Sequence, residues 1–143
     1  MGQPRFLIVS RPPQPELAGG GVVWRLLGAN NRHLGQGERV FAELADCLAA
    51  IGRLQLGLDH ARSVVAGVEH GQLWRWRLEI EGEPVASSTR AYRRQRECQY
   101  SLGLFLAGAR TADPGPRPLV ALPRQGAAPV RPTAGPALRR SGV

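Results

Sequence analysis

Four arginines within seven residues are the feature of this sequence best suited to bind a ligand. Arg90, Arg93, Arg94 and Arg96 follow directly after three hydroxyl side chains, Ser87-Ser88-Thr89. The apolar spacing that follows predicts a helix over about residues 91–107, so the arginines open it, although cations are disfavoured at a helix N-terminus. Free backbone amides, hydroxyls and guanidinium groups together suit a phosphate or a carboxylate. We therefore predict an anion- or nucleic-acid-binding site made by Ser88, Thr89, Arg90, Arg93, Arg94 and Arg96.

Two plainer interpretations of this cluster stay open. A run of like charges is usually a solvated helix face. The arginines could also pair with the acidic start of an earlier predicted helix, at Glu38, Glu43 and Asp46.

A second candidate site is a sheet face that carries Arg25, Arg75 and Arg77, together with Val23 and Leu27. Arginine is enriched at protein interfaces, so an uncovered face of this kind would suit a protein partner or a homodimer. The alternative is a solvated face in which Glu79 pairs with the arginines.

Catalytic and metal-binding patterns do not stand out. His33, His60 and His70 are isolated, and neither cysteine has a second ligand at the short spacing of zinc sites. Ser87-Ser88-Thr89 lacks the glycines of a nucleophile elbow. We expect no catalytic residues, no metal and no cofactor, and therefore a protein that is not an enzyme.

The positive charge is concentrated at the C-terminal end. The formal net charge is +8, and all 19 basic residues are arginine. Residues 109–143 hold six arginines against the single acid Asp113, and seven of the 12 prolines. Such a composition cannot bury enough apolar surface to fold alone, and it predicts a disordered tail. The remainder is nearly neutral, which weakens the case for a nucleic-acid footprint on the folded part.

The elements that must position these residues repeat along the chain. Trp24-Arg25-Leu26 recurs as Trp76-Arg77-Leu78, 52 residues later. With a shift of 51 after the following turn, Phe41 falls on Tyr92 and Cys47 on Cys98. This self-similarity predicts a duplicated unit. We assign 1–58 to the first repeat, 59–108 to the second and 109–143 to the tail.

Each repeat contains the pattern of three strands and a helix. Alternating apolar residues predict strands at about 6–10, 22–28 and 32–36 in the first repeat, and at 63–68, 73–80 and 85–88 in the second. Apolar residues three and four apart predict a first helix from Val40 to about Gly57. Because cysteine is among the most buried residue types, Cys47 and Cys98 are expected in the core.

The second repeat resembles the YegP-like family of unknown function. The resemblance rests on Gly71-Gln72-Leu73-Trp74-Arg75-Trp76-Arg77-Leu78, on Gly82-Glu83-Pro84-Val85-Ala86-Ser87-Ser88, and on Tyr92 followed by the helix with Cys98. It implies an α+β fold of two βββα repeats related by a pseudo-two-fold axis, with an antiparallel sheet and two helices on one face. The usual Asn-Gly turn is replaced by Asn30-Asn31 and by Glu81-Gly82. The family brings no established functional residues.

These observations favour a small non-enzymatic binding or adaptor module that acts by contact with an unknown protein or by dimerisation. The alternative is a nucleic-acid or ribosome-associated protein that grips phosphates through residues 90–96 and the basic tail. No apolar run is long enough to span a bilayer, and no signal peptide is evident, so we expect a cytoplasmic protein without a membrane partner.

Overall fold

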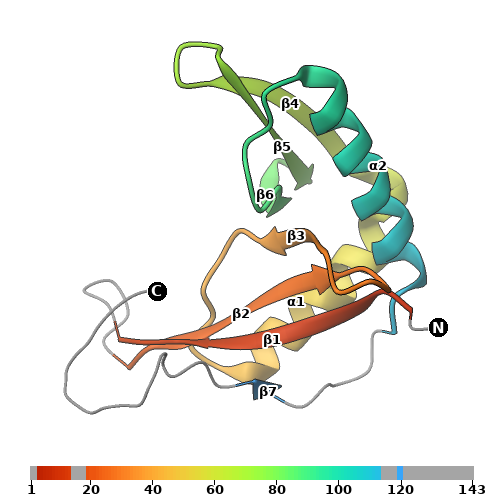
Figure 1. Ribbon diagram of the computed structural model, residues 1–143. Coiled ribbons are helices and arrows are strands. Elements are labelled where there is room, and N and C mark those ends of the chain that lie inside the picture. Colours follow the sequence, from red (N-terminus) through yellow and green to blue (C-terminus); the bar gives the residue numbers. More distant parts are fainter. Residues whose placement is uncertain (1–2, 14–18, 114–118, 121–143) are drawn as a thin grey trace.

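The computed structural model describes residues 3–13, 19–113 and 119–120. Its elements are β1 (Arg5–Arg11), β2 (Gly21–Leu27), β3 (His33–Gly37), α1 (Leu44–Gly57), β4 (Arg62–Val68), β5 (Leu73–Ile80), β6 (Glu83–Ser87), α2 (Gln95–Thr111) and β7 (Leu119–Val120). The strands form one open sheet in the order β4-β5-β6-β3-β2-β1-β7 (Figure 1). β1 to β6 pair antiparallel, and β7 pairs parallel to β1. The expected α+β class is confirmed.

The two inner hairpins, β2–β3 and β5–β6, are built in the same way. β2 pairs with β3 through Arg25 and Gln36, and β5 pairs with β6 through Arg77 and Ser87. Each ladder is interrupted by a register shift, directly after Leu26 in one and after Leu78 in the other. The β5–β6 turn at Glu81-Gly82 has positive φ at both residues, which is the conformation that closes tight hairpins.

Both helices begin later than the sequence predicts. α1 begins at Leu44 rather than Val40, and α2 begins at Gln95 rather than near residue 91. The preceding segments are extended because Phe41 exchanges two backbone hydrogen bonds with Val22, and Tyr92 does the same with Trp74. The predicted starts were wrong because a tertiary backbone pairing overrides the local helical spacing.

α2 also ends later than predicted. The helix continues to Thr111, and Ala109 and Ala112 are buried against the core. The strand β7 lies within the segment predicted to be a tail. Residues 114–118 and 121–143 lie outside the described residues, and so does the prediction of disorder for them.

One hydrophobic cluster joins the sheet to both helices. Phe105 of α2 lies against both tryptophans, with ring centroids 6.2 Å from Trp24 and 4.8 Å from Trp76. Cys47 and Cys98 are fully buried in the same cluster. Burial raises the pKa of the Cys47 thiol to about 11 and also raises that of Cys98, so both remain protonated near neutral pH. The predicted core role of the cysteines is confirmed.

Candidate functional site

The candidate site lies where the two central strands part. β3 and β6 are joined by only two residue pairs, Gln36 with Ser87 and Gly37 with Ala86. Beyond Gln36 and Ser87 the strands separate, and a groove of about 1120 Å³ opens between them. We call this space the basic groove.

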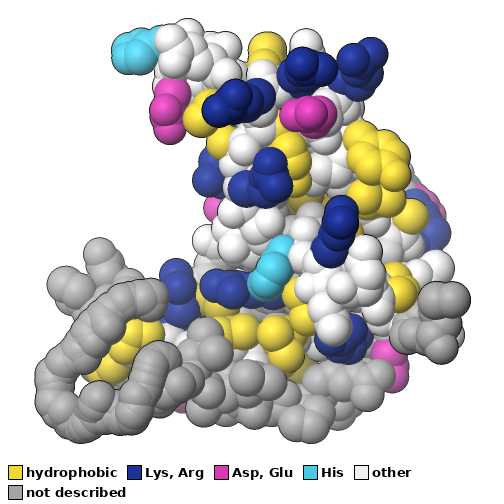
Figure 2. All heavy atoms as spheres, viewed as in Figure 1, with side chains coloured by type: hydrophobic (Ala, Val, Ile, Leu, Met, Phe, Trp, Pro, Cys, Tyr) yellow, Lys and Arg dark blue, Asp and Glu magenta, His cyan; other side chains and the backbone are white. Residues whose placement is uncertain are grey.

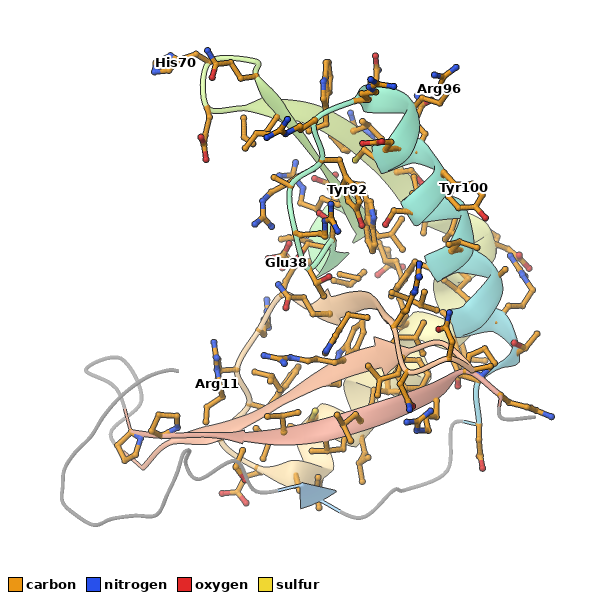
Figure 3. All side chains as sticks on the ribbon, in the orientation of Figure 1. Arg11, Glu38, His70, Tyr92, Arg96 and Tyr100 are labelled. Carbon is orange, nitrogen blue, oxygen red and sulfur yellow. The ribbon has the colours of Figure 1, made fainter. Side chains whose placement is uncertain are left out.

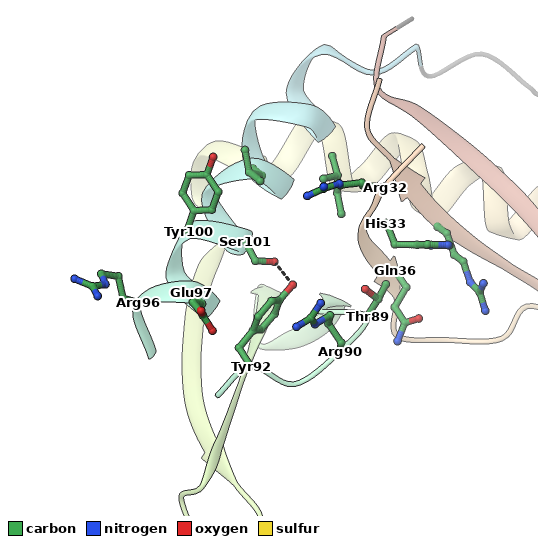
Figure 4. A pocket seen from close by; sticks show the side chains of 13 residues that line it. Arg32, His33, Gln36, Thr89, Arg90, Tyr92, Arg96, Glu97, Tyr100 and Ser101 are labelled. Carbon is green, nitrogen blue, oxygen red and sulfur yellow. Dashed lines mark hydrogen bonds between the residues drawn. The ribbon is translucent and has the colours of Figure 1, made fainter. Parts of the chain in front are cut away.

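Three segments that are far apart in the sequence line the basic groove (Figure 4). One wall comes from the first half of the chain and the other from the segment after β6 and from α2. The first wall consists of Arg25, Arg32, His33, Leu34 and Gln36. The second consists of Thr89, Arg90, Tyr92, Arg96, Glu97, Tyr100, Ser101 and Leu104. Arg96 and Tyr100 lie at the end farthest from Arg32 and His33, on the outer side of α2 (Figures 3 and 4).

A hydroxyl network holds the α2 wall to the sheet. The Ser101 hydroxyl oxygen accepts hydrogen bonds from the Trp76 indole N–H at 3.1 Å and from the Tyr92 hydroxyl at 2.8 Å. The Arg90 guanidinium lies over the Tyr92 ring, 4.8 Å from its centroid, which orients that cation at the groove wall. These two hydrogen bonds fix the Ser101 side chain at the groove wall.

The groove has an excess of positive charge. Four arginines and His33 line it against one acid, Glu97. None of the four arginines forms an ion pair with an acidic side chain in the described part of the chain. Burial, and then repulsion from the nearby Arg11, lower the pKa of Arg25. Figure 2 shows basic side chains gathered on this hollowed side of the molecule.

The structure brings only part of the predicted anion-binding set to this groove. Thr89, Arg90 and Arg96 line it. Arg93 and Arg94 are exposed outside it, and Ser88 is fully buried with no hydrogen-bond partner for its hydroxyl among the described residues.

The local geometry also differs from the sequence expectation. Arg94 is the N-cap of α2, so of the four clustered arginines only Arg96 lies in the helix. No ion pair joins the cluster to Glu38, Glu43 or Asp46 among the residues described.

The predicted sheet-face arginines have separate surroundings. Arg25 lines the basic groove, Arg75 donates a hydrogen bond to the Ser88 carbonyl at 3.2 Å, and Arg77 pairs with Glu79 at 2.9 Å. Val23 and Leu27 are only 8% and 7% exposed. The expectation of an uncovered arginine and aliphatic face is therefore wrong at these two aliphatic positions.

A smaller groove of about 360 Å³ opens at the opposite end of the β3–β6 pairing. It is lined by corresponding segments: Glu38, Arg39 and Phe41 before α1, Ala50, Arg53 and Leu54 on α1, and Glu81, Glu83, Pro84 and Val85 around β6, with Trp24 and Ile80. Here Arg39 is neutralised by Glu83 at 3.0 Å. Under the shift of 51, Phe41 and Ala50 take the places of Tyr92 and Ser101, so the hydroxyl network is missing here.

Sequence reasoning missed Arg32, Gln36, Tyr92, Tyr100 and Ser101 as groove residues. Nothing in the sequence marks Arg32 and Gln36 as groove residues, because only the packing of the two halves brings them to the site. The departures at Tyr92 and Ser101 from their aligned counterparts Phe41 and Ala50 are a signal that the sequence does contain.

Two further observations limit the chemistry of the described residues. None of them form a group of three or more His, Cys, Asp or Glu side chains arranged to hold a metal ion. No described helix is long and apolar enough to cross a membrane.

This geometry defines a mixed sheet-and-helix fold with a central groove, and solved structures share the fold. No protein-family model and no curated protein matches the chain. A solution structure of YegP from E. coli, a protein of unknown function, is similar with a TM-score of 0.57 at 9% identity, covering 78% of this chain and 90% of that one. The UPF0339 protein SO3888 from Shewanella oneidensis gives a TM-score of 0.56 at 8% identity, covering 74% and 86%. The resemblance to YegP-like proteins is thus confirmed for the fold.

Proposed function

We propose that this protein is a non-enzymatic binding module that holds single-stranded nucleic acid in the basic groove. The observation that carries the proposal is the set of four groove arginines that form no ion pair with an acidic side chain among the described residues. In the smaller groove the two arginines Arg39 and Arg53 are matched by three acids, and Arg39 pairs with Glu83 at 3.0 Å. Unneutralised guanidinium groups in a concave site favour a polyanion over a neutral ligand.

The choice of a nucleic-acid strand rests on size and on aromatic side chains. The groove exceeds the usual volume of a small-molecule pocket, about 300–1,000 Å³. Its cations are spread from Arg32, past Arg90, to Arg96 on the outer side of α2, as a ligand with several phosphates requires (Figure 4). Tyr100, also on the outer side of α2, is 69% exposed and offers a ring on which a base can stack. Such stacking tolerates any base, so we expect weak sequence preference.

The smaller groove supports a further proposal about origin. We infer that residues 1–58 and 59–108 are duplicated units related by a pseudo-two-fold axis, followed by the basic segment 109–143. Equivalent ladder registers, equivalent bridges to Phe41 and Tyr92, and helices that begin 51 residues apart support this inference. In this proposal the second unit supplied the groove with the Tyr92 and Ser101 hydroxyls and with Arg96, where the first unit has Phe41, Ala50 and Ala45. Arg90 corresponds to Arg39 of the first unit. A nucleic-acid ligand agrees with a cytoplasmic protein.

The test compares two matched pairs of substitutions. Arg90→Gln with Arg96→Gln removes two charges from the basic groove, and Arg39→Gln with Arg53→Gln removes two from the smaller groove. Binding of a labelled single-stranded RNA or DNA oligonucleotide is followed by fluorescence anisotropy over a range of salt concentrations. We expect the first pair to weaken binding about tenfold or more and to reduce the salt slope by roughly 1.4, since each lost phosphate contact removes about 0.7.

The control pair should change affinity by less than about threefold, because its positions lie outside the proposed contact. Equal losses in both pairs would mean that net charge alone drives binding, and the groove proposal would fail. Repeating the assay on a chain that ends at Val120, which keeps every described element, separates the contribution of the C-terminal arginines. If neither pair of substitutions weakens binding and the truncation abolishes it, the activity belongs to residues 121–143.

The protein-partner hypothesis receives less support from this geometry. Of its three arginines, Arg75 and Arg77 already have partners within the chain, and Arg25 belongs to the groove. Should the oligonucleotides fail to bind, the same variants used as bait would show whether the groove instead holds an acidic peptide.

A further inference from the structure

The two edges of the sheet are unlike. At one edge, β1 is paired over two residues by β7. At the other, β4 has β5 on its inner side and no described strand on its outer side. The β4–β5 ladder runs without a register shift through all seven residues from Arg62 to Val68 (Figure 1). The outer side of β4 therefore presents a regular row of backbone donors and acceptors.

Edge strands usually carry features that prevent pairing with another chain. Charged side chains, prolines, bulges and very short length are the common ones. The segment 63–68, Ser-Val-Val-Ala-Gly-Val, has no charge and no proline. Ser63, Ala66 and Gly67 are exposed, and Val64, Val65 and Val68 are half-buried. β4 thus lacks these protections over most of its length.

An uncharged edge strand can pair antiparallel with a copy of itself without bringing like charges together. The positive charge is concentrated in residues 109–143, and the remainder of the chain is nearly neutral, so net charge does not prevent two copies from meeting at β4. Arg62, at the start of β4, pairs with Glu79 at 3.2 Å, a carboxylate that Arg77 also contacts at 2.9 Å. If two copies pair antiparallel about Val65, Arg62 lies opposite the uncharged Val68 of the other copy, so no like charges meet.

We propose that β4 pairs antiparallel with β4 of a second copy, forming one continuous sheet across a two-fold axis. Backbone hydrogen bonds between the two edges hold the pair, as in other cases of strand addition. No β4 residue lines the basic groove, so the basic groove of each copy remains open in the dimer. Two grooves on one particle would bind a long strand more tightly than one, through effective concentration.

The first experiment measures the mass of the full chain by sedimentation equilibrium, up to about 100 µM, a range that detects micromolar association. We expect a dimer. Ala66→Lys places a like charge close to its symmetry mate and should weaken dimerisation at least about tenfold. Ala49→Lys adds the same charge at an exposed position of α1 and should leave the dimer unchanged. A monomer at all concentrations, or equal effects of both substitutions, would overturn the proposal.

The second experiment locates the interface by single-cysteine crosslinking. Cys47 and Cys98 are buried, so an introduced surface thiol is the reactive one. Cysteines placed in turn at Ser63, Val64, Val65 and Ala66 should form an intermolecular disulfide at the position nearest the two-fold axis, whereas one at Ala49 should not. A dimer that crosslinks at none of the β4 positions uses another surface, and the proposal is then wrong. Capture of a different protein by β4, with the chain itself monomeric, would also contradict it.

Discussion

Ser101 shows how one side chain links the core of this protein to its proposed site. Its hydroxyl receives the indole N–H of the buried Trp76 and the hydroxyl of Tyr92 at the groove wall. At the aligned positions of the first half, Ala50 and Phe41 leave no such network. The network therefore fixes Tyr92, and with it the Arg90 guanidinium that lies over the Tyr92 ring.

We expect Ser101→Ala to lower the free energy of unfolding by about 1–3 kcal/mol, because it leaves the Trp76 N–H buried without an acceptor. Tyr92→Phe should cost about 1 kcal/mol, the net contribution of one hydrogen bond. Urea unfolding followed by tryptophan fluorescence measures both changes. The double variant should lose less than the sum, since the two changes remove a shared bond. Strict additivity would show that the two hydroxyls act independently.

At the scale of elements, two glycines that each lie within a strand or a helix have opposite effects on packing. A side chain at Gly35 of β3 would collide with the Phe105 ring and would lie 2.8 Å from Trp76. Gly52, in α1, has nothing within 4 Å of the position where a side chain would begin. The first glycine thus allows α2 to approach the sheet, and the second is a helix position that gains nothing from being glycine.

Gly35→Ala should destabilise the fold by about 1–3 kcal/mol through overpacking. Gly52→Ala should stabilise it by about 0.5–1 kcal/mol, because alanine loses less conformational entropy in a helix. The midpoints of thermal unfolding should therefore move in opposite directions. If Gly35→Ala leaves the midpoint of thermal unfolding unchanged, Phe105 can move aside. The close contact of α2 with β3 would then not limit the position of the groove wall.

At the scale of the whole molecule, Phe105 connects the two halves of the chain. It comes from α2, yet it contacts Trp24 of β2 as well as Trp76 of β5. The strands of the two halves are otherwise joined through two residue pairs between β3 and β6. We infer that the shared aromatic cluster, more than the strand ladder, makes the halves fold together.

Phe105→Ala should cost about 3–5 kcal/mol, the usual loss for a buried aromatic side chain. Because the contact is shared, we expect fluorescence and circular dichroism to report one coincident transition in the parent chain. Two separated transitions in the parent would contradict the inference that the halves are coupled through this ring.

Local patterns were sufficient for much of this architecture. The alternation of apolar residues predicted β5 with its observed bounds, Leu73–Ile80. The burial of Cys47 and Cys98 followed from their place on the helical stripe and from residue type. The apolar patterns of strands and helices repeat within a few residues, so they can be recognised in a single sequence.

The start of each helix and the identity of the groove depended on tertiary structure. Phe41 and Tyr92 are extended because each pairs with a strand about 20 residues before it. The groove exists because β3 and β6 separate after two residue pairs, which brings Arg32 and Gln36 opposite Arg90 and Ser101. The angle at which packed strands part is set by the core beneath them, and no spacing along the chain encodes it.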